Sequence, residues 1–140
     1  MFKFRLASIK KLKEYIEKQC KDEFARCLTN LYLAQEQQRR TEENIKFMEE
    51  EISGMQQGVL NLPNLIISQD YLSFLHEELV RQKQVVAEKK EELEIARSKL
   101  MEAMKNRKIM DKLEEKQYQQ YIYEQDKKEQ ALLDDFAGRR

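Results

Sequence analysis

Residues 24–55 read FARCLTNLYLAQEQQRRTEENIKFMEEEISGM, with apolar or small side chains at alternating spacings of three and four residues. This heptad pattern is typical of a helix that buries one narrow stripe against another helix. The stripe, called the first seam below, consists of Phe24, Cys27, Leu31, Ala34, Gln38, Thr41, Ile45, Met48, Ile52 and Met55. The pattern therefore predicts that residues 24–55 belong to a coiled coil.

The same pattern continues towards the N-terminus with one irregularity. Ile9, Leu12, Ile16 and Cys20 lead into Phe24 at spacings of three, four, four and four residues. One extra residue in a heptad pattern, a stutter, locally unwinds the supercoil. We therefore expect Ile9, Leu12 and Ile16 to extend the first seam through a stutter.

A cluster of helix-breaking residues follows the first seam: Gly54, Gly58, Asn61, Pro63 and Asn64. A proline inside a helix costs about 3 kcal/mol or more and disfavours a helical conformation for the residue before it. Ser68, just beyond the cluster, is a typical helix N-cap residue. The sequence predicts a single domain with a helix over about 4–56, a connector over about 57–65 and a helix over about 66–137.

A second seam follows the connector and supports a hairpin. Two seams with one break between them favour an antiparallel pair, in which position i faces roughly position 122 minus i. Gln82 then lies level with Gln38 and Thr41, and such a polar layer fixes the register of a coiled coil. We expect an all-α antiparallel coiled-coil hairpin with Ile45 near residues 75–79 and Leu31 near residues 89–93. The second seam consists of Leu72, Leu75, Leu79, Gln82, Val86, Lys89, Leu93, Ala96, Leu100 and Ala103, and less regularly of Arg107, Met110 and Leu113.

The two predicted helices differ in length, which leaves a C-terminal overhang. In the register above, residue 2 meets residue 120, so about 17 to 20 residues extend beyond the paired part. A lone helix of this length is marginal in water. Because this segment carries Tyr121, Leu132 and Phe136, we expect it to bind a partner.

Composition excludes several functional classes. The chain has 26 Lys+Arg and 26 Asp+Glu residues, and this zero formal net charge argues against a nucleic-acid binder. No stretch approaches the length of a transmembrane helix, and the N-terminus has no apolar core of a secretory signal. Cys20 and Cys27 lie about 10.5 Å apart along one helix, beyond the reach of a disulfide. We expect a cytoplasmic protein with both cysteines reduced.

Catalytic motifs are missing from the sequence. His76 is the one histidine, and it lies between Leu75 and Leu79 rather than beside a cysteine. The sequence contains no zinc-protease, paired-cysteine, phosphate-loop or dinucleotide motif. We therefore expect a protein that is not an enzyme, with no catalytic residue, no cofactor and no metal.

Two further surfaces are candidates for binding. The N-terminal segment interleaves Phe2, Phe4 and Leu6 with cations, a pattern that suits either an anionic membrane or, as we favour, packing over the open end of the hairpin. Near the connector, Tyr71 and Phe74 flank the second seam and are expected to be partly exposed. Exposed aromatic side chains indicate a protein partner.

Three stretches resemble the FliJ family of the flagellar type III export apparatus. They are FKFRL at residues 2–6, Tyr71-Leu72 followed by Leu75 and Leu79, and above all EQALLDDFAGR at residues 129–139. The resemblance implies a non-enzymatic stalk that inserts its open end into the pore of the hexameric export ATPase FliI and stimulates it. It also implies contact with the export gate protein FlhA and handling of empty export chaperones.

The resemblance further implies the site residues. The ATPase-binding end corresponds to Phe4, Leu132, Asp135, Phe136 and Arg139. The gate-binding patch corresponds to Tyr71, Phe74, Leu75 and Gln82, with a second strip near Gln38 and Ile45. A monomer is expected, held at the inner face of the cell membrane by its partners and binding no nucleic acid.

Three alternatives remain open on the sequence. The chain could be the equivalent stalk of a virulence injectisome, because the two systems share this architecture. It could be a membrane-surface tether, in which case flotation with liposomes should disappear when Phe2 and Phe4 are replaced by alanine. It could be a parallel homodimeric scaffold, which the mass in sedimentation distinguishes from the monomeric hairpin.

Overall fold

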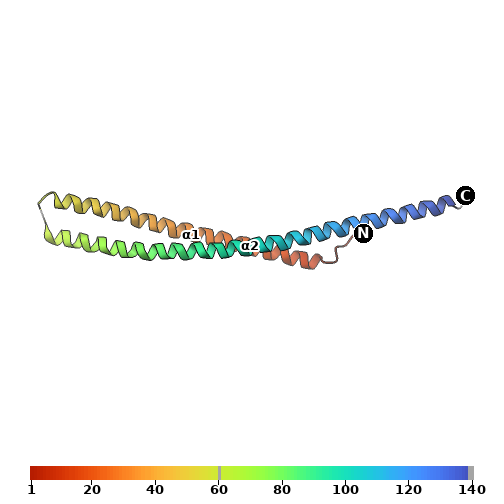
Figure 1. Cartoon of the computed structure of the whole chain (residues 1–140), viewed down its shortest axis with the longest axis horizontal. Helices are drawn as coiled ribbons and strands as arrows, with labels where there is room; N and C mark the ends of the chain where they lie inside the picture. The colour runs from red at the N-terminus through yellow and green to blue at the C-terminus, as the bar shows by residue number, and fades with distance from the viewer. Residues whose placement is uncertain (60, 139–140) are drawn as a thin grey trace. The chain divides into compact units, whose positions relative to one another are not determined.

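The computed structural model describes residues 1–59 and 61–138, which form two α-helices (Figure 1). Helix α1 spans Ala7–Gln56 and helix α2 spans Leu62–Gly138. The described residues contain no strand. The helices pair as an antiparallel hairpin, so the predicted all-α fold is confirmed. Their contacts group into two units: Met1–Asp22 with Ser98–Arg140, called the open-end unit below, and Glu23–Arg97, called the tip unit.

The turn between the helices is tighter than the sequence suggested. Helix α2 begins at Leu62, and the N–H of Leu65 donates to the carbonyl oxygen of Asn61 at 3.0 Å. The Asn61 Oδ1 accepts from the N–H of Asn64 at 3.4 Å, which makes Asn61 the N-cap. Pro63 therefore lies in the first helical turn, where its missing N–H costs nothing.

The expectation that Ser68 caps the second helix is wrong. Ser68 is buried within α2, and its hydroxyl donates to the Met55 Sδ at 3.8 Å. The connector is shorter than predicted because a proline breaks a helix only when it lies beyond the first turn, and Pro63 lies within it.

The tip unit has an apolar core at the predicted seam positions. Cys27, Leu93 and Ala96 form a buried cluster, with Phe24 and Leu31 packed against it. Leu31 packs against the cluster that contains Leu93, the residue expected near it. The Arg97 guanidinium lies over the Phe24 ring at 5.9 Å from the centroid, a cation–π arrangement. The expected register places position 24 opposite about position 98, so the contact of Phe24 with Arg97 lies within one residue of it.

In the open-end unit the first seam follows a different set of residues from the one we expected. Ile9, Leu12 and Ile16 are exposed, Leu12 to 54%, so their assignment to the seam is wrong. The inward positions are instead Lys10, Lys13 and Glu17, which continue the heptad spacing from Cys20 without a stutter. At Lys10 and Glu17, α2 supplies ion-pair partners opposite the charge, as described below.

A polar layer interrupts the apolar seam of the tip unit. Thr41 and Gln82 are both buried, and the Thr41 hydroxyl donates to the carbonyl oxygen of Gln37 at 3.2 Å. In the described part of the chain, the Gln82 Oε1 is buried without a hydrogen-bond partner. An unsatisfied buried acceptor lowers the stability of the fold.

We predict that Gln82→Leu stabilises the hairpin. Leucine fills a similar volume and removes the unsatisfied oxygen, so the free energy of unfolding should rise by about 1 kcal/mol, or roughly 4 °C in melting temperature. Thermal denaturation followed by circular dichroism measures the change. Gln84→Leu, at an exposed position, is the control and should leave the melting temperature nearly unchanged. A lower melting temperature for Gln82→Leu would show that its amide stabilises the seam.

Candidate partner-binding surfaces

The described residues offer surfaces rather than an enclosed chemical site. They hold no group of three or more His, Cys, Asp or Glu side chains that could bind a metal ion. Neither helix, over its described length, contains a stretch long and apolar enough to cross a lipid bilayer. The candidate sites described below lie on the exposed faces of α1 and α2.

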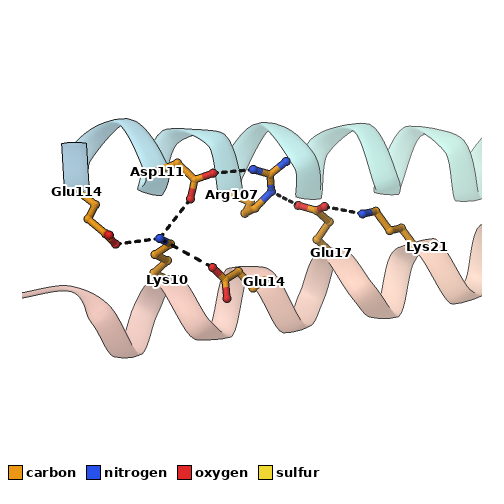
Figure 2. Close-up of polar contacts among 7 residues, drawn as sticks. All are labelled: Lys10, Glu14, Glu17, Lys21, Arg107, Asp111 and Glu114. Carbon is orange, nitrogen blue, oxygen red and sulfur yellow. Dashed lines mark hydrogen bonds and ion pairs between the residues drawn. The ribbon is translucent and has the colours of Figure 1, made fainter. Parts of the chain in front are cut away.

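Lys10 links the two helices of the open-end unit through ion pairs (Figure 2). Its Nζ donates to the Glu114 Oε2 at 2.9 Å and lies 3.6 Å from the Asp111 Oδ1. On its own helix it lies 4.0 Å from the Glu14 Oε1. The hydrogen bond to Glu114, the largest cause, raises the pKa of Lys10 above its ordinary value. This cation therefore occupies a seam position in charged form.

Glu17 forms the second ionic link across the same seam. Its carboxylate accepts a hydrogen bond from the Arg107 Nε of α2 and lies 3.0 Å from the Lys21 Nζ. The Arg107 guanidinium also donates to the Asp111 Oδ2 at 2.6 Å, which joins both links into the one network drawn in Figure 2. Arg107 first and Lys21 second lower the pKa of Glu17 below its ordinary value. The Glu17 side chain is only 8% exposed, so its charge depends on these partners.

Aromatic packing holds the N-terminal segment against α2. The Phe2 ring lies 5.2 Å from that of Tyr118 at an interplanar angle of 76° and 5.4 Å from that of Tyr121. Phe4 and Leu6 are half-buried. These contacts favour packing at the open end over the alternative that the segment is a free membrane tether.

Beyond Tyr121, α2 extends past the N-terminal segment. All of residues 122–138, called the overhang below, are exposed. Leu132 and Phe136, expected at the ATPase-binding end, are 70% and 71% exposed. Asp135 is also exposed, whereas Arg139 lies outside the described residues. The exposure of large apolar side chains over several turns marks a surface that a partner can cover.

The expected gate patch divides into exposed and buried residues. The Tyr71 and Phe74 rings stack with centroids 6.3 Å apart, and these side chains are 44% and 51% exposed. Leu75 and Gln82 are 5% and 9% exposed, so they lie in the seam and position the surface instead of forming it. A partner on this face contacts the two aromatic rings directly.

Sequence reasoning missed apolar residues beside the connector. Leu62, Ile66 and Ile67 are exposed in the first turns of α2, close in sequence to Tyr71. The adjacent pair Ile66-Ile67 was the available signal, because one helix seam can bury only one of two neighbouring residues. These side chains extend the aromatic surface towards the turn.

We predict that Glu17→Gln weakens the open-end unit in a pH-dependent way. Because the folded-state pKa of Glu17 lies below its ordinary value of 4.5, its stabilisation is complete above that value and is lost as the pH falls through the folded pKa. The variant should melt several degrees below the parent chain at pH 7, and the difference should shrink as the pH falls below 4.5 through the folded-state pKa. Thermal scans at pH 7 and at an acidic pH below that pKa test this.

Glu51→Gln is the control for that experiment, because Glu51 is exposed and forms no ion pair among the described residues. It removes the same charge and should show no such pH-dependent difference. An equal deficit of Glu17→Gln at both pH values would mean that packing, rather than the charge of Glu17, stabilises this part of the seam.

Comparison with known proteins identifies the family to which this chain is related. A protein-family model described as "Flagellar FliJ protein" matches residues 2–140. Among solved structures, the chain is similar to a protein described as a YscO homolog, CT670, from Chlamydia trachomatis, with a TM-score of 0.61 and 16% sequence identity. That similarity covers 98% of this chain and 93% of the other, and at this identity it shows a shared fold. A search of curated protein sequences gives no match. Because the family match extends over nearly the whole chain, the protein belongs to the FliJ family.

Proposed function

We propose that this protein is the non-enzymatic stalk of a flagellar type III export apparatus. In this proposal the overhang and the N-terminal segment enter the pore of the hexameric export ATPase FliI and stimulate it. The surface around Tyr71 and Phe74 contacts the export gate protein FlhA, and the chain also handles empty export chaperones. It acts as a monomer, held at the inner face of the cell membrane by these partners. Membership of the FliJ family supports a role in flagellar export.

The observation that carries the proposal is the exposure of every residue of the overhang. A single helix of this length is marginal in water and gains stability when a partner covers it. Its surface combines Leu132, Leu133 and Phe136 with acidic residues such as Glu124 and Asp126. Apolar contacts supply affinity, while exposed charges fix orientation more than they add affinity. Such a surface suits a pore that grips a stalk without holding it permanently.

We predict that deleting residues 124–140 abolishes stimulation of the cognate export ATPase. The Phe2 ring packs against Tyr118 and Tyr121 of α2, and the deletion retains both tyrosines. The truncated chain should therefore stay helical and monomeric. Phosphate release by FliI with and without each chain measures stimulation, while circular dichroism and sedimentation measure the fold.

Leu132→Ser with Phe136→Ser provides a milder variant that keeps the length of the helix. It should reduce stimulation strongly, because both side chains are exposed and contribute little to the hairpin itself. Full stimulation by the truncated chain would show that the overhang is not the inserted element. Unfolding of the truncated chain would show that the overhang stabilises the hairpin.

We predict that replacing Tyr71 and Phe74 by alanine weakens binding to the cytoplasmic part of FlhA by about tenfold or more. Both rings are half-exposed, so the melting temperature should change little. The matched control replaces the exposed Tyr15 and Tyr32 and should leave binding unchanged. A large fall in melting temperature with unchanged binding would assign the two rings to the core of the hairpin. Titration by calorimetry measures the affinity.

An injectisome stalk is the second candidate, favoured by the fold shared with the YscO homolog. Stimulation assays against a flagellar and an injectisome export ATPase separate the two. Greater stimulation of the flagellar enzyme supports the first proposal, and the reverse supports the second.

A further inference from the structure

A lysine-rimmed apolar hollow lies on α2 within the open-end unit, and its residues belong to neither of the two surfaces used above. Its volume is about 450 Å³. Met101, Met104 and Ile109 supply its apolar lining, and Lys105, Lys108 and Lys112 supply its cations. Met101 and Ile109 are exposed, so nothing in the described chain covers the apolar part. This hollow is called the lysine groove below.

The spacing of these residues places them on one face of α2. Met101, Met104, Lys105 and Lys108 follow the spacings of three, four and seven residues that bring side chains together on a helix. The face from Met101 to Lys112 extends over about 16 Å at 1.5 Å per residue. That length matches about three turns of a second helix lying along it.

Cations rather than carboxylates form the charged part of the lysine groove. None of its three lysines forms an ion pair with any residue in the described ranges. The nearby carboxylates of Asp111 and Glu114 are instead paired with Lys10 and Arg107 in the seam. No carboxylate lines the groove itself. A partner that brings its own carboxylates would therefore form charge pairs that the chain lacks.

We propose that the lysine groove docks an acidic amphipathic helix of another protein. The apolar stripe of that helix lies on Met101, Met104 and Ile109, and its flanking carboxylates face the three lysines. Methionine suits this role because its flexible side chain adapts to different apolar shapes. An amphipathic helix in a groove is a common mode of recognition, and complementary charge selects its sequence and orientation. This surface goes beyond the proposed stalk function and does not depend on it.

Defined peptides test the proposal on the full-length chain. The probe is a stapled helix of about 15 residues with a leucine stripe flanked by glutamates. One comparison peptide has lysine in place of glutamate, and another has the acidic composition in scrambled order without the stripe. Fluorescence anisotropy should show that the acidic amphipathic peptide binds at least about tenfold more tightly than either.

Variants locate the binding. The charge reversal Lys105→Glu, Lys108→Glu and Lys112→Glu should abolish binding of the acidic peptide. The matched control reverses Lys18, Lys46 and Lys83, which are exposed and lie outside the groove, and should retain binding. Met101→Ser with Ile109→Ser should also weaken binding by about tenfold, because the apolar lining is lost. Circular dichroism confirms that each variant is folded.

Four results would overturn the proposal. Equal binding of the scrambled acidic peptide would reduce the effect to general electrostatic attraction. Full binding by the groove charge-reversal variant would place the contact elsewhere. Flotation of the chain with phosphatidylglycerol vesicles that requires the same three lysines would assign the groove to lipid. Dimerisation in sedimentation that disappears in the charge-reversal variant would assign it to a second copy of this chain.

Discussion

Antiparallel pairing of α1 with α2 is the constraint on which the other features depend. Each helix offers only a narrow inward stripe, and helices gain most of their stability from packing such a stripe rather than from intrinsic propensity. In the tip unit this stripe is mainly apolar, as the cluster of Cys27, Leu93 and Ala96 shows. Because every inward position must meet a side chain of the other helix, the pairing also decides which residues remain exposed for partners.

The same pairing has a different chemistry in the open-end unit. Lys10 and Glu17 occupy inward positions and meet Glu114, Asp111 and Arg107 across the seam. Ion pairs at such positions contribute less net stability than apolar packing, because the charges lose water on burial. They do impose register, since a shift of either helix would separate Glu17 from Arg107. The open-end unit therefore gains less stability from apolar packing than the tip unit, but its ion pairs fix the register of α1 against α2.

The inward placement of charged residues also determines which side chains of the open-end unit are exposed. With charged residues turned inward, Ile9, Leu12 and Ile16 lie on the outside of α1. On α2, the carboxylates of Asp111 and Glu114 are engaged in the seam, and the lysines of the groove are left unpaired among the described residues. The open-end unit therefore presents apolar and charged side chains together, whereas the exposed aromatic pair Tyr71 and Phe74 lies in the tip unit. Exposed apolar side chains are thus present on both units.

The sequence by itself determined the hairpin, the seams from Phe24 and Leu72 onward and the exposure of Tyr71, because apolar spacing and a proline-containing break are local signals. The structure places the start of α2 at Leu62, with Asn61 as its N-cap. The tertiary structure decided the inward face near the N-terminus. Ile9 and Lys10 are adjacent, and about 100° of rotation around the helix separates them. Only the carboxylates presented by α2 make the inward placement of Lys10 favourable, and those partners are more than a hundred residues away in the sequence.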